Sequence, residues 1–224
     1  MRRPESPSAL VERRERLPGL LELWCAFLRP GEVSWAERSG LAALSTAELE
    51  RLRGLRAPGS RRLFLAGRGL ATAVLARGGR GGEGAVRLEL GPHGKPQVAG
   101  GGGVEFNLTH TGSLVACAVG GGGAVGVDAE SFGRAAEVFE LRGEFMAPRE
   151  RRVADGLPGG EALHFGLTVW TLKESYFKAV GTGLELPLDA AAFERKLGQL
   201  IAESKFEKKV KAVTDEDFTK SFHR

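Results

Sequence analysis

The sequence has little of what marks a secreted, membrane-spanning or dinucleotide-binding protein. Only two of its 224 residues are cysteines, Cys25 and Cys117, too few for a disulfide framework or a zinc site. No apolar run reaches about 18 residues, the length that suggests a membrane-spanning helix. The glycine-rich runs lack the spacing of a phosphate loop or a dinucleotide fingerprint. We therefore expect a cytoplasmic globular protein whose glycine runs are loops.

Nucleic-acid-binding features are also scarce. Aromatic residues make up 7% of the sequence, and no nucleic-acid-binding motif is present. The net charge of +4 is mildly basic and favours anionic partners such as nucleotides or acidic proteins. The first 19 residues are polar and are expected to be disordered. Glu5, Glu12 and Glu15 and the lack of an apolar core argue against a secretory signal there, and the acids also weigh against an organelle transit peptide.

The amino-terminal part of the chain predicts a strand followed by two helices. Apolar residues indicate a buried strand over 20–28. Ser45 or Thr46 can cap a helix, and Glu48 stands where a capping box places its acid relative to Ser45. After an interruption at 58–60, an apolar stripe predicts a second helix over 61–77.

Alternating residues further along predict a strand over 86–90 and a hairpin of two short strands, 114–119 and 124–127, joined by four glycines. Pro148 suits the first turn of a helix. A long helix is expected over 161–180 and is ended by Gly181.

Two pairs of charged residues stand out. Asp128 and Glu130 follow an apolar strand pattern at positions i and i+2, so extended backbone would point both carboxylates to one side. They suit either a solvated edge or a divalent-cation site. Glu174 and Lys178 share one helical face. They suit either a weak surface ion pair or a metal ligand and base beside a phosphate-holding cation. By themselves the residues leave both questions open.

Basic side chains elsewhere could hold phosphate. Arg61 and Arg62 lie with Arg68 at the start of a predicted helix, where a solvated face and a phosphate site are equally consistent with the pattern. Lys95 in a tight loop could equally be a surface lysine. His110 follows a strand-like segment and, considered alone, is better explained as structural.

Taken in order, four blocks resemble the 4′-phosphopantetheinyl transferase superfamily, of the longer surfactin-synthetase-activating type. They are Gly94-Lys95-Pro96, Phe106-Asn-Leu-Thr-His-Thr-Gly112, Val125-Gly-Val-Asp-Ala-Glu130, and Trp170-Thr-Leu-Lys-Glu-Ser-Tyr-Phe-Lys178 with Gly181-Thr-Gly-Leu184. Each block is weak by itself, whereas the ordered set is specific. The resemblance covers roughly residues 20–190.

The resemblance implies an α+β fold, a pseudo-dimer of two similar halves with the active site at their interface. The halves would span about 1–110 and 111–224, and the protein would be a monomer. Such enzymes move 4′-phosphopantetheine from coenzyme A to a serine of an apo acyl or peptidyl carrier protein. The reaction needs Mg²⁺ and releases adenosine 3′,5′-bisphosphate.

The resemblance also assigns roles to residues. Asp128, Glu130 and Glu174 would hold Mg²⁺, and Glu174, or a water that it orients, would be the general base. Lys178 would bind phosphate and assist the leaving group. The remaining coenzyme A contacts are expected from Arg61 or Arg62, Lys95, Thr109, His110 and Lys173.

The carboxy-terminal part departs from the pattern. Six of the nine lysines lie at or beyond Lys196, and we expect no match to the family beyond about residue 195, where further strands normally complete the second half. The atypical tail over 196–224 motivates an alternative, a non-catalytic homologue that binds coenzyme A or a carrier protein. A Mg²⁺-dependent phosphohydrolase would explain the three acids but not the ordered blocks.

Overall fold

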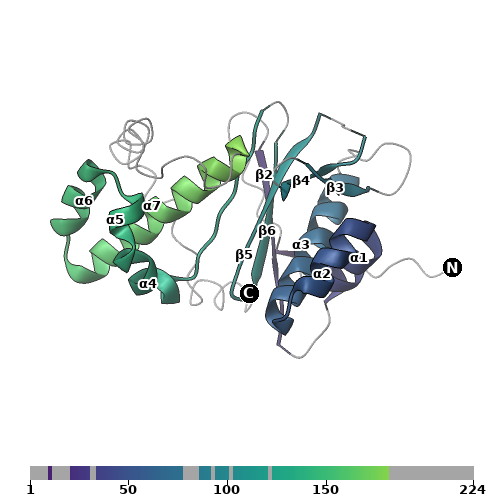
Figure 1. The fold of residues 1–224 in the computed structure, drawn as a ribbon, viewed down its shortest axis with the longest axis horizontal. Helices are drawn as coiled ribbons and strands as arrows, with labels where there is room; N and C mark the ends of the chain where they lie inside the picture. Colours follow the sequence, from purple (N-terminus) through teal and green to yellow (C-terminus); the bar gives the residue numbers. More distant parts are fainter. Residues whose placement is uncertain are drawn as a thin grey trace. The chain divides into compact units, whose positions relative to one another are not determined.

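A computed structural model describes residues 10–11, 21–30, 34–77, 86–91, 94–100, 103–120 and 123–181. Their contacts divide into two compact units. Unit 1 contains the described residues up to Glu130 and those from Glu174 to Gly181, and unit 2 contains Ser131–Lys173. The predicted halves, about 1–110 and 111–224, stay a prediction, and residue 110 lies inside a strand. Helices and strands are mixed, as an α+β fold requires (Figure 1), whereas the pseudo-dimer remains a prediction.

Unit 1 is built on a four-stranded antiparallel sheet in the order β1-β2-β6-β5. Its strands are Leu10–Val11 (β1), Leu21–Phe27 (β2), Glu105–Thr111 (β5) and Leu114–Gly120 (β6). The strand expected over 20–28 is therefore confirmed. The short strand β1 corrects the prediction that residues 1–19 are disordered throughout, because Leu10 pairs with Ala26. A separate two-stranded sheet pairs Leu88–Leu90 (β3) with Pro96–Val98 (β4).

The hairpin in this sheet differs from the predicted one. Strands β5 and β6 form it, joined by Gly112 and Ser113, with Thr111 opposite Leu114. Gly112 has a φ of +55°, in the region that glycine enters at low cost. The prediction that 114–119 would pair with 124–127 is wrong, because β6 already bonds to β2 on one side and to β5 on the other. Residues 124–130 form an irregular segment instead.

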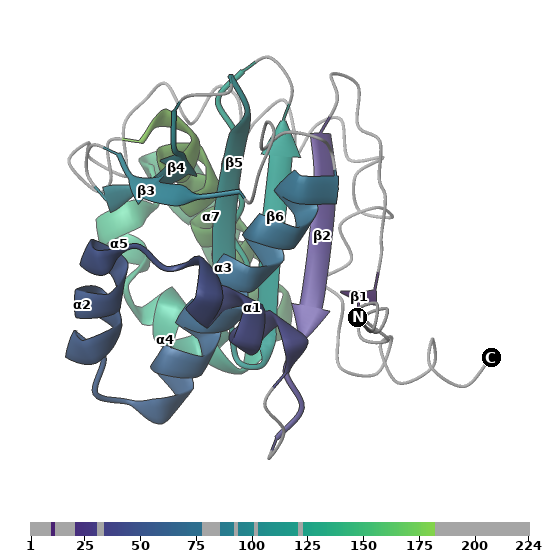
Figure 2. The same ribbon diagram turned by 90° about the vertical axis from the view of Figure 1, so that its right-hand side faces the viewer.

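Three helices complete the amino-terminal part, Trp35–Ala43 (α1), Thr46–Gly54 (α2) and Pro58–Arg77 (α3). The capping box of α2 forms as predicted, with Ser45 accepting from Glu48 N and Glu48 accepting from Ser45 N. Helix α3 starts earlier than expected, at Pro58, because proline is tolerated in a first turn. Figure 2 shows α1 and α3 in front of the sheet formed by β2, β6 and β5.

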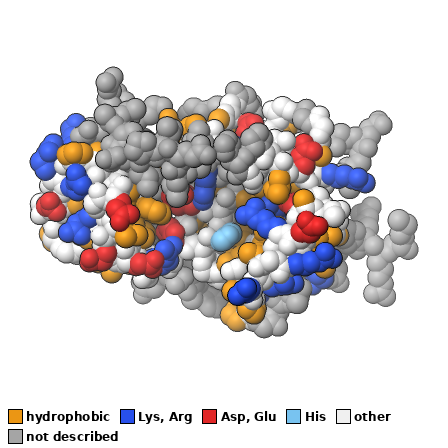
Figure 3. Space-filling model, in the orientation of Figure 1, with side chains coloured by type: hydrophobic (Ala, Val, Ile, Leu, Met, Phe, Trp, Pro, Cys, Tyr) orange, Lys and Arg blue, Asp and Glu red, His pale blue; other side chains and the backbone are white. Residues whose placement is uncertain are grey.

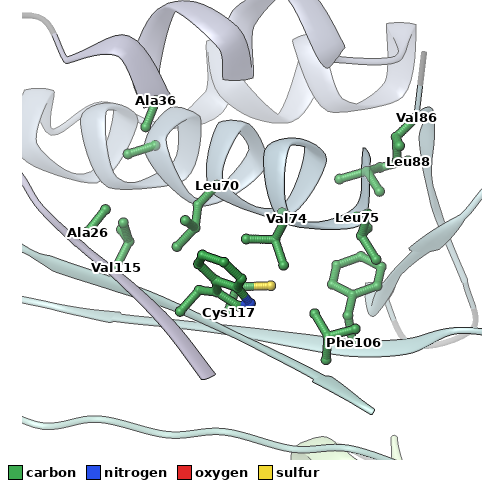
Figure 4. Packing of buried hydrophobic residues seen from close by; sticks show 14 of the residues in the cluster. Ala26, Ala36, Leu70, Val74, Leu75, Val86, Leu88, Phe106, Val115 and Cys117 are labelled. Carbon is green, nitrogen blue, oxygen red and sulfur yellow. The ribbon is translucent and has the colours of Figure 1, made fainter. Parts of the chain in front are cut away.

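The core of unit 1 lies between α3 and this sheet (Figure 4). Leu70 and Val74 point from α3 toward Val115, Cys117 and Phe106 on the strands, and all five side chains are at most 3% exposed. Burial of this apolar surface fixes one face of β5 and β6 against the helix. Their other face is left for residues that follow in the chain.

Unit 2 consists of short segments beside a long helix. They are Phe132–Arg134 (η2), Ala135–Glu140 (α4), Arg142–Phe145 (α5) and Pro148–Asp155 (α6). The long helix, Gly159–Val180 (α7), starts two residues before the predicted position and stops at Gly181 as predicted. Its residues from Glu174 onward belong to unit 1. No helix among the described residues is long and apolar enough to cross a membrane.

Candidate functional site

The candidate site is organised by strand β5, whose side chains alternate between two faces. Phe106 and Leu108 face the core beneath α3, and His110 continues this series. Asn107, Thr109 and Thr111 face the opposite way, toward residues 127–130. The two neighbours that were expected to bind coenzyme A together, Thr109 and His110, therefore lie on different faces of the strand.

Asp128 is the most constrained acid of this site. Its side chain is 7% exposed. Thr109 Oγ1 donates to its Oδ1 (3.1 Å), and Lys178 Nζ donates to the same oxygen at 2.5 Å. Its buried Oδ2 makes no hydrogen bond within the described part of the chain. A buried carboxylate oxygen left without a donor is costly, so this oxygen is suited to accept a cation.

The end of α7 approaches this segment at the backbone level. A Cβ added at Gly126 would lie 1.8 Å from Ser175 O and 2.5 Å from Ala179 N. Only glycine allows this contact. It places the segment that carries Asp128 directly on the helical turn that carries Glu174 and Lys178.

Lys178 contacts a carboxylate that lies far from it in the sequence. Its ammonium pairs with Asp128, 50 residues away in the sequence, and also lies 3.5 Å from Thr109 Oγ1. The lysine side chain is 31% exposed, so it is reachable by a ligand. Helix α7 thus brings the ammonium group of Lys178 to the carboxylate of Asp128.

Glu174 lies in an electrostatic environment suited to a base. Burial raises the pKa of its carboxyl above the usual value, and the negative charge of Asp128 raises it further. The charge of Lys178 opposes this shift, and Glu130 adds to it. A carboxyl whose pKa is moved toward neutrality is a better proton acceptor at physiological pH.

The three acids fit a cation in chemistry more than in present geometry. Carboxylate oxygens are the ligands that Mg²⁺ prefers, and Asp128 offers a free buried oxygen. Within the described residues, however, no three His, Cys, Asp or Glu side chains stand together as a ready-made metal group. The residue types present are therefore those that a divalent cation prefers, and Asp128 offers the buried oxygen without a hydrogen bond.

The remaining expected ligand contacts are distributed around unit 1. His110 is exposed, and partial burial and the nearby charge of Lys178 lower the pKa of its imidazole. Lys95 Nζ lies 3.2 Å from Glu105 Oε2, so a phosphate would have to compete with this exposed pair. Both residues remain predictions as coenzyme A contacts.

The arginine cluster separates into members with different environments. Arg68 is 6% exposed and pairs with the fully buried Glu48, which removes it as a ligand residue. Arg62 donates to Glu37 Oε1 (3.0 Å) and to Arg29 O (2.6 Å). Arg61 donates to Leu52 O but is exposed. Figure 3 shows Lys and Arg side chains gathered over the region of α1–α3, and Arg61 is the most exposed of the three clustered arginines.

Lys173 is a correction to the expected ligand set. It belongs to unit 2, is 0% exposed, and donates to Phe145 O (2.5 Å) and to Glu150 Oε2 (2.6 Å). A lysine with no accessible surface cannot contact coenzyme A. Successive helical residues are about 100° apart, so Lys173 points away from the face that carries Glu174 and Lys178.

The roles of three polar residues that have clear structural partners were not predicted from the sequence. Asn107 and Thr111 belong to the block that contains Thr109, and the period of two on a strand would have placed them on the same face. Glu150 lies in the first turn of α6, two residues after Pro148. Its pairing with Lys173 joins residues 23 apart and leaves no local signal.

Comparison with known proteins shows which family part of the chain resembles. Residues 124–218 match the sequence model of the 4′-phosphopantetheinyl transferase superfamily. That range includes Asp128, Glu130, Glu174 and Lys178. It also extends past residue 195, so the expectation that the match would end there is wrong. The tail itself lies outside the described residues.

Individual relatives carry the same name. The 4′-phosphopantetheinyl transferase HetI of Nostoc sp. is 35% identical over 147 residues, which are 64% of this chain and 62% of the relative. A phosphopantetheinyl transferase of Thraustochytrium sp. is 31% identical over 190 residues, 79% of this chain and 66% of the relative. The chain thus spans just under two thirds of these relatives. In its matched residues, it is similar to the 4′-phosphopantetheinyl transferase superfamily.

Proposed function

We propose that this protein transfers the 4′-phosphopantetheine group of coenzyme A to a serine of an apo acyl or peptidyl carrier protein. The observation that carries the proposal is the cluster of Asp128, Glu174 and Lys178 in unit 1. It combines a buried carboxylate oxygen without a donor, a carboxyl with a raised pKa and a partly exposed ammonium. The long pseudo-dimeric subtype, a monomeric state and a cytoplasmic location are part of the same proposal.

The reaction needs a proton acceptor and stabilisation of phosphate charge. The serine oxygen forms a bond to the phosphorus that carries the pantetheine, and the bond from that phosphorus to the bridging oxygen breaks. Glu174 accepts the serine proton, directly or through a water. Lys178 neutralises the negative charge that develops on the departing adenosine 3′,5′-bisphosphate.

A divalent cation fits the remaining requirement. Asp128, Glu130 and Glu174 would hold Mg²⁺, which when bound would neutralise the diphosphate and orient it. Around it, Thr109 keeps Asp128 in place through its single hydroxyl hydrogen. Because that hydrogen is already used, we assign Thr109 to holding the carboxylate and leave the 3′-phosphate to His110, Arg61 and Lys95.

The direct test is incubation with coenzyme A, Mg²⁺ and an apo carrier protein, followed by intact-mass spectrometry. A mass gain of one phosphopantetheine group on the carrier is expected, and chelation of Mg²⁺ should abolish it. Asp128→Asn and Glu174→Gln should each remove transfer. Full turnover by folded samples of either variant would refute the assignment. Binding of coenzyme A without transfer to any of several carriers would favour the non-catalytic alternative.

A further inference from the structure

The face of β5 opposite the core carries a row of three polar side chains, of which the proposed reaction uses only Thr109. Asn107, Thr109 and Thr111 occupy alternate positions and project to the same side. Asn107 and Thr109 are only 6% and 5% exposed. Buried polar groups require partners, and these residues find theirs in the segment that carries the two acids.

The contacts form a ladder with a period of two residues on both sides. Asn107 Oδ1 accepts from Val127 N at 3.0 Å, and Thr109 Oγ1 accepts from Ala129 N at 3.2 Å. Thr109 Oγ1 also donates to Asp128 Oδ1, and Thr111 Oγ1 donates to Glu130 Oε2 at 3.3 Å. Every second residue of the strand therefore holds a successive part of residues 127–130.

Side chains are needed here because the segment crosses the face of the sheet. Backbone donors and acceptors of β5 lie in the plane of the sheet, where they bond to β6, whereas side chains stand roughly perpendicular to it. A segment lying over the face can be anchored only by side chains. The same geometry explains the small residues Ala116, Ala118 and Gly120 beneath it on β6.

We propose that Asn107, Thr109 and Thr111 are positioning residues that set the register and orientation of Asp128 and Glu130. The inference rests on the proposed function, since it concerns the carboxylates that would hold the cation. Asn107 and Thr109 fix the backbone on either side of Asp128, while Thr111 orients the carboxylate of Glu130. Without these bonds, the acids would remain in the chain but lose their common direction.

The first experiment tests the ladder independently of catalysis. Hydrogen exchange of the Val127 amide is followed by NMR in the wild type, in Asn107→Leu and in Thr111→Val. Asn107→Leu removes the acceptor at similar size, so exchange at Val127 should accelerate by about 2- to 13-fold, the range that corresponds to one net hydrogen bond. Thr111→Val should leave that amide unchanged, because Val127 N donates to Asn107, whereas the hydroxyl of Thr111 donates to Glu130.

The second experiment tests the consequence for the site. Mn²⁺ affinity of the full chain with coenzyme A is measured by electron paramagnetic resonance, together with the Mg²⁺ dependence of transfer. Thr111→Val should weaken Mn²⁺ binding by about 10-fold, typical of residues that orient metal ligands. Thr111→Ser keeps the hydroxyl and should bind Mn²⁺ as tightly as the wild type. The KM for coenzyme A should not change in either variant. Thr72→Val removes a hydroxyl bonded within α3 to Arg68 O and serves as the matched control.

The outcomes separate the two proposals. Wild-type Mn²⁺ affinity in Thr111→Val, with unchanged exchange at Val127 in Asn107→Leu, would overturn the positioning role while an active wild type upholds the function. A wild type that neither binds Mn²⁺ nor transfers would overturn both as stated. Accelerated exchange at Val127 would then still show that Asn107 anchors the segment. Equal losses of Mn²⁺ affinity in Thr111→Val and Thr111→Ser would also contradict the role assigned to the Thr111 hydroxyl.

Discussion

Replacing Lys173 by methionine should lower the stability of unit 2 without changing the affinity for coenzyme A. Methionine keeps the length of the lysine stem but cannot pair with Glu150, which is itself only 4% exposed. Removing one partner of a buried ion pair leaves an uncompensated charge and costs about 3–5 kcal/mol. Since many domains have a total stability of only about 5–15 kcal/mol, the loss should be obvious in denaturant unfolding.

The neighbouring contacts allow a sharper test by a double-mutant cycle. Glu150 Oε2 also accepts from Ala147 N at 2.7 Å, so Glu150→Gln keeps an acceptor for that amide while removing the charge. The double variant Lys173→Met/Glu150→Gln contains no buried charge at this place. Its loss of unfolding free energy should be smaller than the sum of the two single-variant losses, by a coupling energy of about 2 kcal/mol.

Unfolding in denaturant and calorimetric titration with coenzyme A provide the readouts. Arg134→Met, which breaks an exposed pair with Glu137 in the same unit, is the control and should leave the unfolding midpoint unchanged. A loss below about 1 kcal/mol in Lys173→Met would contradict the energetic reasoning. Weaker coenzyme A binding by a still-folded variant would instead restore the original prediction that Lys173 is a ligand residue.

Three further predictions concern unit 1. Gly126→Ala should destabilise the protein by about 1–3 kcal/mol in chemical denaturation, because its Cβ meets Ser175 O; Gly143→Ala, with nothing within 4 Å, should not. Glu174→Gln should raise the thermal midpoint at pH 8. The native carboxyl, with its raised pKa, holds a proton that the unfolded chain has released, so wild-type stability falls as pH rises from the unfolded to the folded pKa; a midpoint equal to wild type at pH 8 would contradict this. Cys117 is completely buried, which raises the pKa of its thiol; thiol reagents followed by peptide mass mapping should label it only after unfolding.

Local chemistry was predictable from the sequence. Ser45 and Glu48 signal their capping box within four residues, and Pro148 and Gly181 mark a helix start and a helix end. The alternation of Asp128 and Glu130 correctly predicted that both acids face one side, since both accept from threonines of β5. Each of these signals lies within a few neighbouring residues, where backbone geometry alone decides the outcome.

Long-range pairing was not predictable in the same way. The apolar runs 114–119 and 124–127 look alike in sequence, and only the occupation of both edges of β6 excludes the second from the sheet. Similarly, no sequence pattern near Lys173 indicates that it pairs with Glu150. The choice of Asp128 rather than Glu174 as the partner of Lys178 depends on the backbone contact at Gly126.

The turn at Gly112 and Ser113 determines which insertions strand β5 can tolerate. It sets the pairing of Thr111 with Leu114, and through it decides which side of β5 each residue faces. A slip of one residue would exchange the two faces, moving the threonines beneath α3 and sending Phe106 toward the acids. Single insertions in β5 should therefore be far more damaging than paired ones, which preserve the alternation. The length of this two-residue connection is thus as much a functional constraint as the identity of any acid in the site.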